Sequence, residues 1–343
     1  MSLSRRNFLQ KTAITTGMAT IGTLGMARSS GAGEIEKEKL PREVWIACFS
    51  QTGIYADTAE LMVEQVLEAL KELESYHPDF VCLPEVFPCT HVRKTYTNKE
   101  ILTISEWTLG QFSAYSRKNN CYTICPVYTS GSDGSIYNSA VVINRQGEQV
   151  GTYRKIHITE GEISEGITPG SLFQPVIQTD FGKIGIQICY DINWDDGWTM
   201  LKQQGAEIVF WPSAFGAGRM INAKAWQHKY VVASGTQTND SKICDISGEE
   251  LAKTGFWNPG LCYSPVNLEK VFLPIWPNNK IFGKIRKKYG RKVRFVLFQE
   301  EGLATIESRS PDVFVNDILK EFNLKKQEDE LKSAEIAQEK ARR

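Results

Sequence analysis

Two hydrophobic patterns alternate along the chain from residue 43 to about residue 309. Short apolar runs, such as Val44–Phe49 and Phe80–Leu83, predict buried β-strands. Between and after them, Leu61–Leu73 and Ser105–Asn119 carry apolar residues at the spacing of an amphipathic helix. This order of strands and helices indicates an α/β protein that contains parallel strand pairs.

Residues that favour caps and turns mark where the elements begin and end. Asp57 and Ser105 are the expected N-caps of the two helices. Gly131–Gly134, Arg145–Gly147 and Ser247–Gly248 are expected turns of β-hairpins. Further strands are predicted at Tyr122–Tyr128, Tyr137–Asn144, Glu148–Tyr153, Val176–Thr179, Lys183–Ile188, Ile208–Trp211, Val231–Thr236, Ile243–Asp245 and Leu251–Thr254. The simplest arrangement is a mixed sheet with helices on one face.

The first 32 residues have the pattern of an export signal. Paired arginines in Ser4–Phe8 precede an apolar, small-residue run from about Thr12 to Ala27. This resembles a twin-arginine signal peptide and predicts an exported protein, either periplasmic or extracellular, in a bacterium. The run is too short for a secure membrane span, which needs about 20 apolar residues. The alternative is a tail that happens to contain Arg-Arg.

The C-terminal part of the chain is rich in charge. Eight Lys/Arg residues lie between Lys280 and Arg294, without the interleaved aromatic residues of a nucleic-acid-binding module. We interpret them as a solvated helix face. Val313–Leu324 predicts a docking helix, and the charged segment beyond it predicts a solvated helix or disordered chain. We therefore expect a main domain over residues 43–311 and an extension over residues 312–343.

The composition excludes several classes of protein. Forty Lys/Arg balance forty Asp/Glu among 343 residues, so no global field favours nucleic acid. Eight cysteines lack the spacing of a disulfide scaffold or a Cys-x-x-Cys metal site. Four histidines form no cluster, and for His157 we expect a structural role. From these patterns we expect no metal and no cofactor. The expected partner is a small molecule, as the family resemblance given below implies.

One cysteine stands apart because a predicted strand ends at it. In Lys183–Asp191 alternating Ile and small residues lead directly to Cys189, and polar residues follow before a helix. A strand-to-helix turn can hold a nucleophile exposed on a tight bend. The N–H of Tyr190 would then point to the place where an oxyanion forms. Taken alone, such a cysteine is more often an inert core residue.

Two other predicted strand ends carry ionisable side chains. Glu85 follows an apolar strand and Pro84, where burial would raise the pKa of a general base. A glutamate here could equally cap a helix or pair with an arginine. Lys155 leaves another strand and enters a loop that ends at Glu165–Gly170. Its ammonium could stabilise a negative oxygen as it develops.

Together these segments resemble the nitrilase superfamily of carbon–nitrogen hydrolases, in order from about residue 44 to residue 311. The matching segments are Leu83–Phe87, Tyr153–His157, Glu165–Gly170, Gly185–Asp191, Ala206–Ser213, Tyr230–Ala233 and Ser241–Gly248. The resemblance implies an α/β fold, a four-layer α-β-β-α sandwich of two mixed sheets. It also implies a homodimer or higher homo-oligomer.

The resemblance assigns roles to the polar residues. It implies that Glu85 is the base, that Cys189 is the nucleophile, and that Lys155 and the Tyr190 N–H hold the oxyanion. Glu165 matches the second glutamate of the family, which positions the substrate and the lysine. A thioester would form as ammonia or an amine departs, and water would then release the acid.

The residues after the cysteine bear on the substrate. Tyr190-Asp191 resembles the amidase and carbamoylase branches, whereas nitrilases often have Trp-Glu at this point. A linear amide or an N-carbamoyl compound is therefore the expected substrate, with Asp191, Trp194 and Phe215 as expected contacts. Asn193–Asp196 departs from the aromatic residue, Pro and Glu of many relatives. The alternatives are a nitrilase that acts on a C≡N bond and a non-catalytic binding protein on the same fold.

Overall fold

The computed structural model describes residues 39–238 and 240–343. The expected export signal lies outside the described residues. Those residues form two six-stranded sheets and one three-stranded sheet, together with helices.

The first sheet has the strand order β12-β1-β2-β3-β4-β5. Its strands are β1 (Glu43–Phe49), β2 (Phe80–Cys82), β3 (Tyr122–Ser130), β4 (Ile136–Ile143), β5 (Gln149–Arg154) and β12 (Leu261–Asn267). β1, β2 and β3 pair in parallel, and the remaining pairs are antiparallel. In β1, Ile46 and Cys48 belong to one core cluster, whereas Ala47 and Phe49 belong to another. Because successive side chains point to opposite faces, a strand buried on both faces is apolar throughout.

The second sheet has the order β11-β10-β9-β8-β7-β6. Its strands are β6 (Ile177–Thr179), β7 (Gly182–Ile186), β8 (Ile208–Phe210), β9 (Val231–Ser234), β10 (Lys242–Cys244) and β11 (Glu250–Lys253). β7, β8 and β9 pair in parallel, and antiparallel strands complete both edges. The inner core between the sheets joins Ile46 and Phe80 of the first sheet to Ile184 and Phe210 of the second.

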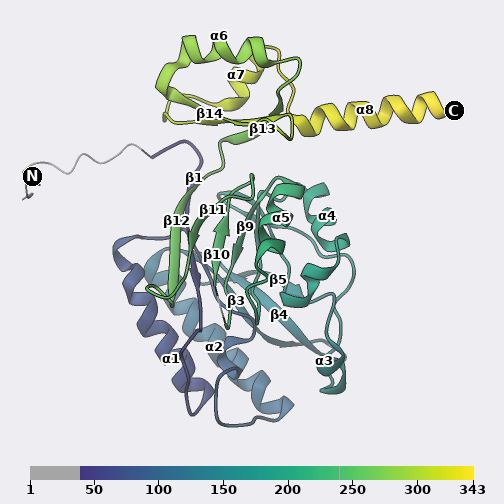
Figure 1. Cartoon of the computed structure of the whole chain (residues 1–343). Coiled ribbons are helices and arrows are strands. Elements are labelled where there is room, and N and C mark those ends of the chain that lie inside the picture. Colours follow the sequence, from purple (N-terminus) through teal and green to yellow (C-terminus); the bar gives the residue numbers. More distant parts are fainter. Residues whose placement is uncertain (1–38, 239) are drawn as a thin grey trace, which may run out of the picture. The chain divides into compact units, whose positions relative to one another are not determined.

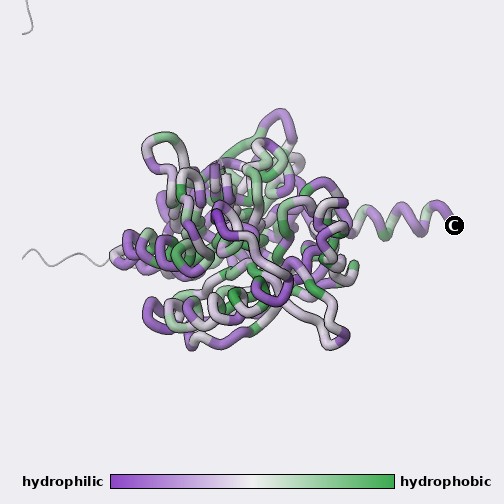
Figure 2. The backbone as a smooth tube through the Cα atoms, turned by 90° about the horizontal axis from the view of Figure 1, so that it is seen from below, coloured by the Kyte–Doolittle hydropathy of each residue, from purple (hydrophilic) through white to green (hydrophobic). Residues whose placement is uncertain are grey.

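Helices cover the outer face of each sheet (Figure 1). α1 (Ala59–Ala69) and α2 (Asn98–Asn119) pack on the first sheet, and α4 (Asp196–Gln203) and α5 (Arg219–His228) pack on the second. The layers therefore follow the order α-β-β-α, as the family resemblance predicts. The single sheet expected from periodicity alone was wrong, because periodicity identifies strands but not their partners. Figure 2 shows the helix that ends at the C-terminus as mainly hydrophilic, with only a few hydrophobic positions.

The caps of both outer helices on the first sheet differ from the expected ones. Thr58 caps α1, in place of Asp57. α2 begins seven residues earlier than expected, where Thr97 and Glu100 form a capping box. Ser105 lies inside α2, and its hydroxyl donates to the carbonyl of Ile101 at 2.7 Å. The Thr-x-x-Glu pattern at residues 97–100 is the signal that marks this start.

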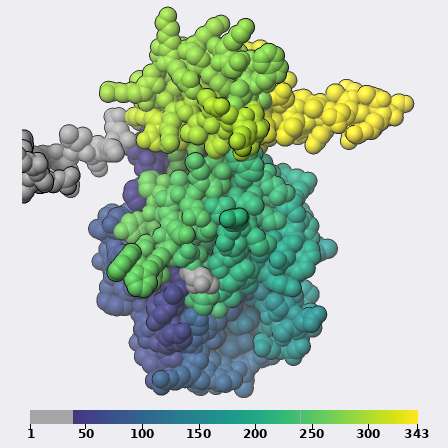
Figure 3. Space-filling model, in the orientation of Figure 1, coloured from purple at the N-terminus to yellow at the C-terminus, as the bar shows by residue number. Residues whose placement is uncertain are grey.

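The C-terminal part forms a module with its own core. β13, β15 and β14 make the three-stranded sheet, and residues 271–324 supply the core cluster. In the space-filling view of Figure 3 this module is the part coloured light green to yellow. The elements are β13 (Lys270–Pro274), α6 (Asn279–Tyr289), β14 (Val293–Phe298), β15 (Leu303–Ser308), α7 (Val315–Glu321) and α8 (Gln327–Arg342). The expected boundary at residue 311 thus falls within this module. The basic segment lies largely on α6, which buries Phe282 and Ile285, and α8 has no buried residue.

Shorter helical turns complete the described structure. They are η2 (Leu70–Ser75), η3 (Phe87–Cys89), α3 (Glu160–Ser164), η4 (Cys189–Asn193) and η5 (Gly290–Lys292). None of the helices in the described part of the chain has both the length and the apolar character that crossing a bilayer requires.

Candidate active site

Three strand ends deliver the polar residues that the sequence singles out. Glu85 follows β2, Lys155 follows β5, and Cys189 follows β7. β5 runs in the same direction as β2, because β3 is parallel to β2 and two antiparallel pairings lead from β3 to β5. The carboxyl ends of β2 and β5 therefore lie at one edge of the first sheet. The Tyr153 hydroxyl of β5 reaches Asp191, two residues after Cys189, at 2.7 Å, so the end of β7 lies beside them. All three residues are buried there.

Lys155 is the centre of a closed ionic network. Its ammonium lies 2.8 Å from Glu85 Oε1, and 2.8 and 3.0 Å from the two carboxylate oxygens of Glu162. The amide of Asn138 donates to both carboxylates at 2.8 Å. Burial lowers the pKa of Lys155, but the charges of Glu85, Cys189 and Glu162 outweigh it and raise that pKa overall. The ammonium therefore keeps its proton.

The second carboxylate that contacts Lys155 belongs to Glu162 and not to the predicted Glu165, which lies three residues further along the chain. Glu162 is the third residue of α3 and also closes a capping box with Thr159. Glu165 caps the other end of α3, and its side chain is exposed. The loop offers several carboxylates at close spacing, and sequence alone does not tell which of them turns inward. The Thr-x-x-Glu pattern at residues 159–162 was an available signal.

Cys189 is held on a strained turn. Its φ is 46°, a left-handed conformation that costs a non-glycine residue about 1–3 kcal/mol. Two bonds fix the turn: the Cys189 N–H donates to the Pro212 carbonyl at 2.9 Å, and the Trp211 indole donates to the Cys189 carbonyl at 3.1 Å. Such strain persists only where the surroundings over-determine it, and it clusters at functional sites.

The thiol of Cys189 is neutral at rest. Burial and the negative charge of Glu85 raise its pKa to about 12, while Lys155, the Ala214 N–H and the Ser213 side chain oppose that rise. The charges of Glu85 and Lys155 thus both act on this sulfur. A thiol with such a pKa needs a base that takes its proton as it attacks.

The residue after the cysteine presents a free donor. No hydrogen bond between described residues engages the N–H of Tyr190. Its ring is 38% exposed and meets the Trp194 ring edge-on, with the ring centroids 5.1 Å apart. Trp194 is 40% exposed, so two partly exposed aromatic rings lie beside the turn at Cys189.

The structure places the three expected substrate contacts differently. Asp191 is fully buried, and both carboxylate oxygens accept hydrogen bonds from the protein, among them the Tyr153 hydroxyl at 2.7 Å. Because a buried carboxylate must be saturated by donors, Asp191 is anchored internally, and its expected contact with substrate is corrected. Phe215 packs against two core clusters and edge-on to Trp211. Of the three, Trp194 is the exposed one.

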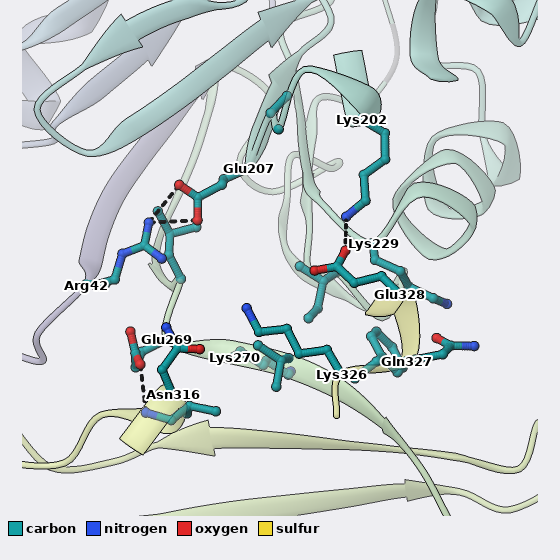
Figure 4. Close-up of a pocket in the computed structure, with 17 residues that line it drawn as sticks. Arg42, Lys202, Glu207, Lys229, Glu269, Lys270, Asn316, Lys326, Gln327 and Glu328 are labelled. Atoms are coloured by element: carbon teal, nitrogen blue, oxygen red, sulfur yellow. Dashed lines mark hydrogen bonds and ion pairs between the residues drawn. The ribbon is translucent and has the colours of Figure 1, made fainter. Parts of the chain in front are cut away.

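A cavity lies beside the segments that precede β8 and β9, with β13 and the first residues of α7 and α8 on its other side (Figure 4). Its volume is about 400 Å³, and its lining includes none of the residues discussed above. Ion pairs cross its walls, with Arg42 to Glu207 at 2.7 Å and Lys202 to Glu328 at 2.8 Å. The carboxylates of the cavity thus neutralise these two cations. Because ion pairs hold its walls together, we call this cavity between the second sheet and the C-terminal module the joint cavity, and its lining residues the joint region. Among residues 39–238 and 240–343, no group of side chains has the makings of a metal site.

Comparison with known proteins identifies the family. The family model "Carbon-nitrogen hydrolase" matches residues 46–272, which is more than half of the chain, so the chain belongs to the carbon–nitrogen hydrolase family.

One similar curated protein is the deaminated glutathione amidase of Mus musculus. It is 30% identical over 190 residues, which span 47% of this chain and 58% of the mouse protein. The match thus takes in less than two thirds of that relative's length.

Solved structures share the fold. A carbon–nitrogen hydrolase from Helicobacter pylori G27 superposes with a TM-score of 0.59 at 20% identity, covering 73% of this chain and 94% of that one. A mutant of the amidase from Nesterenkonia sp. AN1, which shows the Michael addition of acrylamide at its active-site cysteine, gives a TM-score of 0.54 at 17% identity. That match covers 64% of this chain and 92% of the amidase.

Proposed function

We propose that this protein hydrolyses the carbon–nitrogen bond of a linear amide or an N-carbamoyl compound, with Cys189 as the nucleophile. The observation that carries the proposal is the buried network in which the Lys155 ammonium joins Glu85 to Glu162. Both Glu85 and Lys155 act electrostatically on the Cys189 thiol. A neutral thiol, a carboxylate base and a fixed cation are the parts that acyl transfer requires.

The first half of the reaction acylates the cysteine. Glu85 takes the Sγ proton as sulfur forms a bond to the carbonyl carbon, and the carbonyl oxygen becomes negative. Lys155 and the Tyr190 N–H donate to that oxygen. When the oxyanion collapses, the C–N bond breaks, and the proton on Glu85 passes to the departing nitrogen. Ammonia or an amine leaves, and a thioester remains on Cys189.

The second half of the reaction returns the enzyme to its starting state. Glu85 takes a proton from water, and the oxygen of that water attacks the thioester carbon. The same two donors hold the second oxyanion. The C–S bond then breaks, the carboxylic acid is released, and Glu85 returns its proton to the Cys189 sulfur. Asn138 and Glu162 keep Glu85 and Lys155 in place throughout.

Two observations favour an amide-type substrate. The curated relative from mouse is named as an amidase, and the structural neighbour from Nesterenkonia is an amidase. The exposed rings of Tyr190 and Trp194 would give the acyl or amine group an apolar wall.

The test is a panel of linear amides, N-carbamoyl amino acids and matched nitriles, with the release of ammonia and of amine measured for each. We expect turnover of amide or carbamoyl compounds and none with Cys189→Ala. Glu85→Gln should show neither turnover nor an acyl adduct on Cys189 by intact-mass spectrometry, because glutamine cannot take the proton of the thiol. Turnover of nitriles alone would make the protein a nitrilase, and no turnover with an unmodified Cys189 would favour a binding protein.

A further inference from the structure

His157 lies two residues after Lys155, and both nitrogens and one face of its ring have partners. Its ring is stacked on Trp194, with centroids 4.3 Å apart and planes inclined by 6°. Nδ1 lies 3.1 Å from Asp191 Oδ1, and Nε2 lies 3.4 Å from Asp196 Oδ2. The side chain is only 15% exposed. The ring thus bridges two carboxylates and supports an indole.

Asp191 ties the lysine loop to the nucleophile turn. Its Oδ2 accepts from the Tyr153 hydroxyl at 2.7 Å and from the Ile188 N–H at 2.8 Å. Its Oδ1 accepts from the His157 N–H at 2.7 Å, besides the contact with the ring. Two of these donors lie two residues on either side of Lys155, and the third is the residue before Cys189. The position of Asp191 therefore sets the position of Lys155 relative to Cys189.

Trp194 connects His157 to the second proposed oxyanion donor, the N–H of Tyr190. One face of its indole rests on His157, and the indole also meets Tyr190, whose N–H is unengaged among the described residues. Loss of the ring of His157 would leave Trp194 without its stacking partner. Tyr190 would then be free to shift with Trp194.

We infer that His157 is a positioning residue, which through its two ring nitrogens and its stacked face holds Lys155 and the Tyr190 N–H at the oxyanion. The inference rests on the proposed function, because it concerns that same site. His157 does not touch the reacting atoms and acts through Asp191, Asp196 and Trp194. A misplacement of about 1 Å in such a site can cost about 10²-fold in rate.

The bridge has a pH dependence with a definite sign. The hydrogen bond with Asp191 raises the pKa of His157 above its usual value of about 6.5, against the opposing effect of burial; the charges of Asp191 and Asp196 add to the rise. These two carboxylates, one from η4 and one from the first turn of α4, are the charged groups that face the ring. Below its pKa both nitrogens donate, and the bridge is complete. As the pH rises through that pKa, one donor is lost, so kcat should fall.

Three substitutions separate the parts of this role. His157→Asn keeps a donor at the position of Nδ1, His157→Gln keeps one near Nε2, and His157→Phe keeps only the stacked ring. His228 supplies the matched control. It is also buried, its Nε2 lies 2.9 Å from Asp195, and its ring stacks on Tyr230, yet it lies on α5 outside the proposed site.

The experiment measures kcat and KM from pH 6 to 9 on the amide that the wild type hydrolyses fastest, together with the Tm of each variant. For His157→Phe we expect kcat to fall by about 10²-fold with KM changed less than about threefold. His157→Asn should recover about tenfold of that loss, and its kcat should no longer decline with rising pH. His228→Phe should lower the Tm and leave the pH profile unchanged.

Two results would overturn the inference. One is a His157→Phe variant that loses Tm as His228→Phe does but keeps the kcat and pH profile of the wild type. The other is a His157→Asn variant no more active than His157→Phe. If His157→Phe does not fold, the Asn and Gln variants decide the question through their pH profiles.

A measurement that needs no substrate separates failure of this inference from failure of the proposed function. The rate at which iodoacetamide alkylates Cys189, followed by mass spectrometry over the same pH range, reports on the nucleophile turn directly. If the wild type cleaves no compound of the panel, the proposed function fails, and this rate alone tests His157. If the wild type is active, and substitution of His157 changes neither kcat nor the alkylation rate of Cys189, only the positioning role fails.

Discussion

Two lysines in different regions, Lys155 and Lys229, show how burial and neighbours together set the state of an ammonium. The Lys155 side chain is 2% exposed and faces Glu85 and Glu162, and its pKa rises. Lys229 is half-buried at the wall of the joint cavity, and burial with the nearby charge of Lys202 lowers its pKa to about 8.

The difference lies in the partners and not in the degree of burial. The Lys229 ammonium lies over the Trp226 ring, 3.6 Å from its centroid, and 4.2 Å from that of Phe272. Within the described chain no carboxylate forms an ion pair with it. Two ring faces do not offset the loss of water around a cation as two carboxylates do. The more deeply buried lysine is therefore the one that holds its proton more tightly.

The largest expected effect is on amide turnover, which should depend on the region around Lys155 and not on the region around Lys229. Cys189→Ala should abolish amide turnover, with a loss on the order of 10⁴-fold or more, because no other group can form the thioester. Lys229→Met, in the joint region, should keep turnover within about twofold. Ammonia release under identical conditions measures both. Comparable losses in the two variants would mean that the joint takes part in catalysis.

The next effect concerns the charged lysine itself. Lys155→Met should lower kcat by about 10²–10³-fold, the scale for loss of an oxyanion donor. Lys155→Arg keeps the charge and should lose less. Thermal unfolding is the control, because Glu85 and Glu162 would face each other without the ammonium in the Met variant. A folded Lys155→Met enzyme with near-normal kcat would contradict the assigned role.

A smaller effect distinguishes the two candidate carboxylates. Glu162→Gln removes the charge that holds the Lys155 ammonium and should lower kcat by about tenfold or more. Glu165→Gln is the matched control on an exposed side chain of the same loop and should change kcat by less than about twofold. If the order of the two losses is reversed, the predicted second glutamate is the correct one after all.

The smallest effect is on stability and tests Lys229. Its pKa is lowered to about 8 in the folded protein, whereas an unfolded lysine titrates near about 10.4. Between these values the unfolded chain binds more protons, so the free energy of unfolding attributable to this group rises with pH. Exposure of part of the side chain reduces the effect. The Tm of the wild type relative to Lys229→Met should therefore increase from pH 7.5 to 10, and a flat difference would show that the ammonium is well solvated.

The sequence located the strand ends well and the helix starts poorly. Glu85 and Cys189 each follow an apolar run, and such runs are legible because a strand buried on both faces is apolar throughout. Lys155 instead follows the mostly exposed edge strand β5, which the neighbouring turn and hairpin pattern indicated. The starts of α2 and α3 were both misjudged or overlooked, although each carries a Thr-x-x-Glu capping box. Reading that pattern would have placed Thr97 at the start of α2 and drawn attention to Glu162.

Polar partners from other segments were beyond the reach of the sequence. Asn138 comes from β4 and bonds two carboxylates, 53 and 24 residues away along the chain. Asp191 was expected to be a polar residue open to substrate, and it is instead fully buried among three donors from two segments. Apart from the capping box at Glu162, the local pattern does not separate an inward carboxylate from an outward one, because both occur in short polar segments between strands and helices.

By itself the sequence determined the strands up to residue 254, the presence of helices between them, the order of the motifs and the position of Cys189 at a strand end, because these depend on periodicity and on residues adjacent in the chain; it missed β12, β13, β14 and β15. Only the tertiary structure decided that the strands divide into two facing sheets, that Glu162 holds Lys155, and that His157 and Asp191 link that lysine to Cys189. Those choices depend on which distant groups meet at the same edge of the sandwich, where each buried charge must find its partner.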